Sequence, residues 1–184
     1  MARTSTASPK TGSAIRYDGD PLDPYIKAAI GFFELGDQDS CLEELKKIPI
    51  KFLTTGTLKT LTLEFYKGLE RWDLLATFAL SLPETPSYRL YLAAAEKNRS
   101  GPAAAEKVLR QTLLKFPDHA IMQYYLACYV CQQGRLEEAR LMVGRAMELD
   151  SELRVYLHRS PELEPIRHAF KVSKELTRTR SHGR

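Results

Sequence analysis

The chain has 184 residues, of which 43% are hydrophobic and 27% are charged, and its formal net charge at pH 7 is +4. This length suits one domain with a sizeable core. Residues 171–184 carry five Lys or Arg side chains against one Glu, a net charge of +4, so the rest of the chain is close to neutral. A surface that neutralises phosphates needs its basic excess on the fold itself. The charge distribution therefore argues against a nucleic-acid-binding domain.

The N-terminal segment and the number of cysteines indicate in which cellular compartment the protein is expected. Residues 1–20 are rich in Ser, Thr, Gly, Ala and Pro and contain no apolar run of signal-peptide length, which predicts a disordered N-terminal segment. The longest apolar runs fall short of the roughly 18 residues that a membrane span needs, so we expect no membrane insertion. Three cysteines, an odd number, fit a reducing compartment, and the predicted location is cytoplasmic.

From Pro21 onward, apolar residues recur three and four positions apart and are interrupted by Gly and Pro, which predicts an all-α chain without strands. Asp23 is a candidate N-cap, with Pro24 in the first helical position, and Gly36 and Gly134 are candidate helix ends. The expected helices are residues 25–35, a second that ends at 48, a third that follows the connection 51–56 and ends near 69, and then 72–82, 87–98, 102–116, 120–133 and 136–149.

These helices repeat in pairs. Placing Gly36 over Gly134 gives a period of 34 residues and four units, at 22–55, 56–85, 86–119 and 120–153. The last unit has small or apolar residues at Leu126-Ala127, Leu136, Ala139 and Ala146. Two antiparallel helices can approach closely only where small side chains lie between them.

The 34-residue pattern resembles that of the tetratricopeptide repeat (TPR) family over roughly residues 22–170. The first unit matches at Tyr25, Ala28-Ala29, Phe32, Gly36 and Leu45, and the third at Leu92-Ala93, Ala105, Leu109 and Pro117, whereas the second is four residues short and matches only at Tyr66 and Trp72. The resemblance implies an α-solenoid of about four TPR-like helix hairpins. It also implies a repeat domain over 21–176, with a capping helix over 154–176, and a basic C-terminal tail over 177–184.

The residues after the last unit are expected to close it. Ser160 is a candidate N-cap, with Pro161 in the first helical position and Glu162 in the first turn. The stretch "SPELEPIR" also resembles an acidic D-P-x-L-x-P-L segment that closes a group of bacterial TPR proteins, with Ser160 in place of the Asp. This resemblance favours a bacterial type of repeat protein.

Cys128 and Cys131 form a C-x-x-C spacing in the last turns of a predicted helix. A reactive thiolate is favoured at a helix N-terminus, and zinc would need two more ligands than this pair supplies. We therefore interpret both cysteines as packing residues. The four histidines have no metal-binding spacing, and the chain has no phosphate-binding glycine loop and no nucleophile motif. We expect no metal, no cofactor and no catalytic activity.

TPR proteins bind a peptide or a helix along their concave face, at fixed positions on the first helix of each unit. By the register of the repeats, the resemblance implies a partner-binding groove formed by Ile26, Ile30, Phe33, Thr60, Glu64, Lys67, Leu90, Ala94, Lys97, Tyr124, Cys128 and Cys131. The chaperone-docking members hold a carboxylate with Lys and Asn at such positions, but Ile26, Ile30, Leu90 and Ala94 stand there in this chain. The alternative is that some of these residues are buried against adjacent helices or the closing segment.

The leading hypothesis is a non-catalytic scaffold or adaptor that binds a protein or peptide partner in this groove. Self-association through the same groove is a variant of it. Two alternatives remain open: a helical-repeat protein that associates with nucleic acid through its basic C-terminal tail, and a secretion-type chaperone, which this chain resembles in size and outline.

Overall fold

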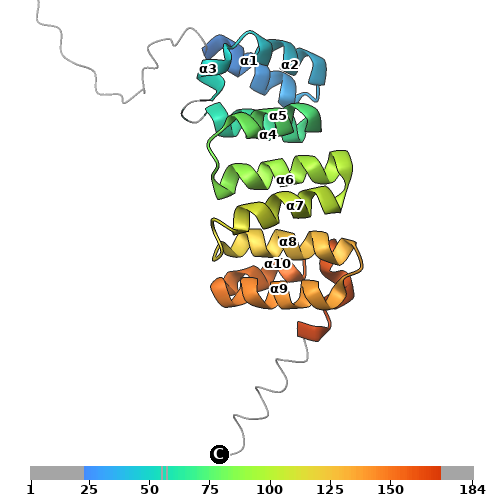
Figure 1. Cartoon of the computed structure of the whole chain (residues 1–184). Coiled ribbons are helices and arrows are strands. Elements are labelled where there is room, and N and C mark those ends of the chain that lie inside the picture. Colours follow the sequence, from blue (N-terminus) through green and yellow to red (C-terminus); the bar gives the residue numbers. More distant parts are fainter. Residues whose placement is uncertain (1–22, 55, 57, 171–184) are drawn as a thin grey trace, which may run out of the picture. The chain divides into compact units, whose positions relative to one another are not determined.

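The computed structural model describes residues 23–54, 56 and 58–170, and the predicted N-terminal segment 1–20 and C-terminal tail 177–184 lie outside them. Every regular element within those residues is helical, and none is a strand (Figure 1). The all-α prediction is therefore confirmed for the described part of the chain. The chain divides into two compact units, Met1–Pro49 and Ile50–Arg184, and this boundary lies inside the predicted repeat unit 22–55.

The first unit contains a helix pair, α1 (Asp23–Glu34) and α2 (Gln38–Lys46). Gly36 lies in the turn between them with φ +74°, a conformation that glycine adopts without strain. The carboxylate of Asp37 then caps α2 by accepting a hydrogen bond from the Ser40 backbone N–H at 3.1 Å. Helices α1 and α2 pack against each other, and Ala29, Cys41 and Leu45 are buried. The predicted helix end at Gly36 is confirmed.

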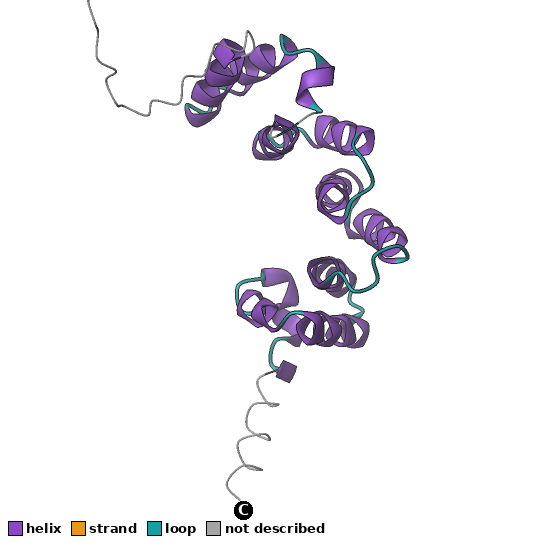
Figure 2. Ribbon diagram, turned by 90° about the vertical axis from the view of Figure 1, so that its left-hand side faces the viewer, coloured by secondary structure: helices purple, strands orange, loops and turns teal. Residues whose placement is uncertain are grey.

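The second unit begins with a four-residue helix, α3 (Ile50–Leu53), where the sequence had predicted only a connection. Three longer pairs follow: α4 (Leu58–Gly68) with α5 (Trp72–Ser81), α6 (Pro86–Ser100) with α7 (Pro102–Leu113), and α8 (Ala120–Gln132) with α9 (Leu136–Leu149). From α4 to α9, each helix packs against the next one along the chain, and α6 also reaches back to α4 (Figures 1 and 2).

Small side chains lie between α8 and α9, as the repeat pattern predicts. Ala127 of α8 and Ala139 and Ala146 of α9 are all fully buried. Gly134 makes the turn between the helices with φ +78°. Because alanine carries only a methyl group, the two helix backbones can approach closely here. Helix α9 begins and ends at the residues that the sequence predicted.

The segment after α9 is not the single capping helix that the sequence predicted over 154–176. Residues 151–170, which we call the closing segment, contain three short helices: η1 (Ser151–Leu153), α10 (Arg154–Leu157) and η2 (Pro161–Ile166). Pro161 and Pro165 lack the backbone N–H that a continuous α-helix uses, which breaks the helix. The closing segment buries Leu157, Leu163 and Ile166 in the core around α8 and α9.

Ser160 occupies the predicted N-cap position of η2, with Pro161 at the start of the helix and Glu162 in its first turn. Its side chain, however, makes no capping hydrogen bond. Instead, the Ser160 hydroxyl pairs with the Tyr124 hydroxyl of α8 at 2.7 Å. Within the closing segment, the Arg167 guanidinium donates to the carbonyls of Leu157 and Ser160 at 3.2 and 3.1 Å. The hydrogen bond between Tyr124 and Ser160 thus helps to hold the closing segment on α8, in addition to the buried Leu157, Leu163 and Ile166.

Candidate functional site

A hollow of about 430 Å³ opens between α4, α6 and α8 of the second unit. We call it the tyrosine groove. Its lining is mainly apolar and aromatic: Lys67, Ser87, Leu90, Tyr91, Ala94, Ile121, Tyr125 and Tyr129. Lys67 is the only charged residue in this lining. Aromatic side chains of this kind give a large contact area for little loss of conformational entropy, so the groove has the composition of a binding surface.

Tyr91 of α6 is fixed in the groove by two residues of α4. Its hydroxyl donates a hydrogen bond to the Glu64 carboxylate, and the Lys67 ammonium lies 5.8 Å from the centre of its ring. Lys67 also pairs with Glu64 at 3.4 Å. Burial and the neighbouring Glu64 carboxylate raise the pKa of Tyr91 to about 12, so its hydroxyl stays protonated at neutral pH. The ring is therefore positioned before any ligand arrives.

Helix α8 contributes Ile121, Tyr125 and Tyr129, which are four residues apart and so lie on one helix face. The side chains of Ile121 and Tyr125 are 43% and 45% exposed, although both are large and apolar or aromatic. The Tyr125 ring packs edge-on against Tyr124, with 6.1 Å between ring centres. A free surface that presents such residues together is characteristic of an interaction site.

The structure brings together some of the groove residues that the sequence predicted. Lys67, Leu90 and Ala94 line the tyrosine groove. Glu64 supports the groove through Tyr91, whereas Thr60 is exposed on α4 and Lys97 is partly exposed on α6. The first repeat supplied three predicted groove positions, Ile26, Ile30 and Phe33. These residues are half-buried in α1 of the first unit and do not line this groove.

The placement of Tyr124, Cys128 and Cys131 on an open face is wrong. All three side chains are only 4% exposed. They lie on the face of α8 that packs into the core, and the closing segment covers this helix. The alternative of burial under the closing segment is therefore the correct one for these residues. The open face of α8 carries Tyr125 in place of Tyr124, one position further along the helix.

The groove also contains residues that the repeat register did not predict: Ser87, Tyr91, Ile121, Tyr125 and Tyr129. The spacing of Ile121, Tyr125 and Tyr129 is a signal that could have found the α8 face. Helix α8 is apolar nearly all round, however, and has no charged residue in Ala120–Gln132 that would mark a solvent face. The position of the closing segment decides which face remains open.

The two cysteines of α8 have the properties of packing residues. Cys128 and Cys131 are buried and are not joined by a disulfide. Burial, reinforced by the Glu162 carboxylate, raises the pKa of the Cys128 thiol to about 12. Burial also raises the pKa of Cys131. Since the thiolate is the reactive form, this environment suppresses thiol chemistry.

We expect Cys128 of the folded chain to resist alkylation. With a pKa near 12 instead of 9, its thiolate population at pH 8 is about a thousandfold smaller, and burial blocks access as well. Site-resolved mass spectrometry after timed N-ethylmaleimide treatment should show labelling at least a hundredfold slower than in guanidinium-unfolded chain. Equal rates in the folded and unfolded chains would contradict the burial of this thiol.

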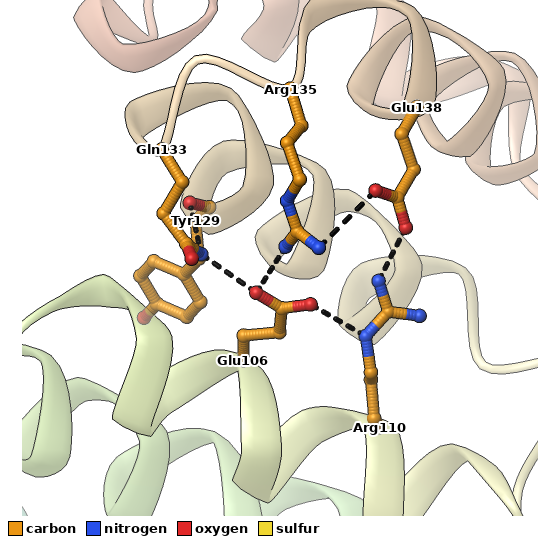
Figure 3. A network of polar contacts seen from close by, with 6 residues as sticks. All are labelled: Glu106, Arg110, Tyr129, Gln133, Arg135 and Glu138. Carbon is orange, nitrogen blue, oxygen red and sulfur yellow. Dashed lines mark hydrogen bonds and ion pairs between the residues drawn. The ribbon is translucent and has the colours of Figure 1, made fainter.

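A second polar cluster surrounds Glu106 of α7, which is only 8% exposed (Figure 3). Its carboxylate accepts hydrogen bonds from Arg110 at 2.6 Å, from Gln133 at 2.7 Å and from Arg135. The two arginines also pair with Glu138 of α9, as Figure 3 shows. The cluster therefore ties α7 to α9 and to the turn before it.

The cluster keeps Glu106 ionised. Hydrogen bonds from Arg135, Arg110 and Gln133 lower the pKa of the Glu106 carboxyl to about 2, and they outweigh the opposing effect of burial. Both carboxylate oxygens of Glu106 thus have partners within the cluster. We assign it a structural role, which is to join neighbouring helix pairs.

Comparison with known proteins gives no family for the chain: no model of a known protein family matches it, and no curated protein shows significant similarity to its sequence. Within the described residues, no helix is long and apolar enough to cross a membrane. In the same part of the chain, no group of three or more His, Cys, Asp and Glu side chains is arranged to hold a metal ion.

Proposed function

We propose that the chain is a non-catalytic adaptor of the TPR type, whose helix pairs form an α-solenoid and whose tyrosine groove binds a helix or peptide of a partner protein. The observation that carries this proposal is the cluster of apolar and aromatic side chains that line the groove on α6 and α8, above all the exposed Ile121 and Tyr125. The 34-residue period and the buried alanines between α8 and α9 support the TPR assignment.

The position of the groove is consistent with this role. It is lined by the first helices of three successive pairs, α4, α6 and α8, which is where a TPR protein is expected to bind its partner. Three buried cysteines without a disulfide suit a reducing compartment, so we place this function in the cytoplasm. The likeness of residues 160–167 to the closing segment of bacterial TPR proteins favours a bacterial setting.

We expect the double variant Leu90→Glu, Tyr125→Glu to lose its partner. Both side chains line the groove, and two carboxylates there would have to be desolvated on binding. The measurement is affinity capture from a lysate of the source cells, with quantitative mass spectrometry of the retained proteins. A species bound to the wild type should fall at least tenfold on the variant.

The matched control is Leu114→Glu, Leu141→Glu, which introduces the same two charges at side chains that are 85% and 65% exposed outside the groove. It should retain the partner, and circular dichroism should show equal helicity for all three proteins. If the groove variant and the control retain the same species in equal amounts, the tyrosine groove is not the binding site.

A further inference from the structure

We propose that the segment bound in the tyrosine groove is an acidic amphipathic helix of another protein. This inference rests on the function proposed above and adds the chemical class of the partner. Its apolar side chains would enter the hollow between α6 and α8, and its carboxylates would lie over lysines of α4 and α6.

The charges on the three lining helices favour an acidic ligand. Helices α4, α6 and α8 contain two acidic residues, Glu64 and Glu96. Glu64 is occupied by Tyr91 and Lys67, and Glu96 pairs with Arg99 at 2.7 Å and lines a different hollow, beside α7. No acidic side chain in the lining of the groove would therefore repel a carboxylate.

Three lysines on α4 and α6 supply the positive charge. Lys67 lines the groove, and its side chain is about half exposed. Lys59 lies 5.6 Å from the ring centre of Tyr88 on α6, and Lys97 is on the same helix as Leu90 and Ala94. In the described part of the chain, neither Lys59 nor Lys97 forms an ion pair, so both can receive an incoming carboxylate. Complementary charge of this kind raises the association rate and fixes the orientation of a ligand.

The other end of the groove differs in charge. Helix α8 has no charged residue, and the Glu162 carboxylate of the closing segment adds to the effect of burial in raising the pKa of Tyr129, which lines the groove. The acidic residues of the ligand should therefore lie over α4 and α6, whereas its large apolar residues contact Ile121 and Tyr125. This difference in charge between the two ends of the groove would determine the orientation in which the helix binds.

The walls of the groove favour a helix over an extended peptide. They are helices, whose backbone groups are already hydrogen-bonded, and the polar side chains in the lining are Lys67, Ser87 and the tyrosine hydroxyls. An extended peptide would bury N–H and C=O groups with few partners, which is costly. A helix satisfies its own backbone and presents apolar anchors three and four residues apart.

The test is selection from a random 16-residue peptide display library on the full-length protein. The selection is run in parallel on the wild type and on the groove variant Leu90→Glu, Tyr125→Glu. We expect peptides enriched on the wild type alone to have net negative charge and apolar residues at helical spacing. If the peptides specific to the wild type are basic or neutral, the inference is overturned while the proposed function stands. If no selected peptide requires the groove for binding, both the inference of an acidic ligand and the proposed function are overturned.

The role of the lysines is then measured with the most enriched peptide, labelled with a fluorophore. The triple variant Lys59→Gln, Lys67→Gln, Lys97→Gln should bind it at least tenfold more weakly, and raising the salt concentration should weaken binding to the wild type. The control Arg99→Gln, Lys107→Gln, Arg140→Gln removes the same number of charges from other surfaces and should bind normally. Equal affinity of the two triple variants would refute the acidic-ligand assignment.

Discussion

Leu163→Ala should lower the free energy of unfolding by about 3 kcal/mol, the typical cost of removing a fully buried leucine from a packed core. Leu163 belongs to η2 and is completely buried against the core around α8 and α9. A pocket left under the closing segment cannot collapse easily, because Pro161 and Pro165 restrict the backbone on either side. Urea unfolding followed by circular dichroism would measure the change.

Thiol labelling can show where the Leu163→Ala variant is weakened. The closing segment covers the helix that carries Cys128, so its loosening should make this thiol react faster before the whole chain unfolds. The control is Glu164→Ala, a change at the neighbouring exposed position, which should cost less than about 0.5 kcal/mol. Equal stability of the two variants would show that the closing segment contributes little to the core.

Glu106→Gln should destabilise the chain by about 2 kcal/mol, after allowance for the solvent that reaches its arginine partners. The substitution keeps the size of the side chain but removes the charge that Arg110 and Arg135 share. The two guanidinium groups would then face each other across a neutral amide, with Glu138 as their remaining acidic partner. Urea denaturation at pH 7 would measure the loss.

The contribution of Glu106 should also depend on pH. Its folded-state pKa is about 2, well below the ordinary value of 4.5. In this range the unfolded chain binds more protons than the folded chain, so the stabilisation is complete above about pH 4.5 and is lost as the pH falls towards 2. The stability difference between wild type and Glu106→Gln should therefore shrink over that interval.

Glu137→Gln is the matched control for Glu106→Gln. Glu137 pairs with Arg140 at 2.9 Å, but its side chain is 83% exposed, and exposed pairs of this kind contribute little. We expect its unfolding curve to overlay that of the wild type at pH 7. A Glu106→Gln variant that matched this control would exclude a stabilising role for the cluster in Figure 3.

Local signals in the sequence predicted most of the helices. Gly36 and Gly134 end helices with positive φ values, and periodicity together with the break at Gly134 placed α9 at Leu136–Leu149. Helix α3 was missed because four residues are too few to show a helical period. Propensity and spacing are thus sufficient where an element is long and one of its faces is polar.

The candidate site could be predicted only in part, because it depends on contacts between distant residues. Tyr124 and Tyr125 are adjacent and chemically identical, and only the closing segment, about 36 residues further on, decides which of them is covered. The sequence pattern also did not predict Glu106 as the centre of a polar cluster. Its partners Gln133 and Arg135 lie 27 and 29 residues away, a separation at which spacing carries no information about contact.

Helix α8, which has no charged residue, is synthesised before the segment that covers it. Its sequence AIMQYYLACYVCQ leaves the ribosome before the residues that cover it, because the closing segment begins only at Ser151. Until then the nascent chain exposes an aromatic, charge-free stretch of the kind that associates with other unfolded chains. A protein shortened before the closing segment should therefore accumulate as aggregates, whereas one that extends through Phe170 keeps the residues that cover this helix.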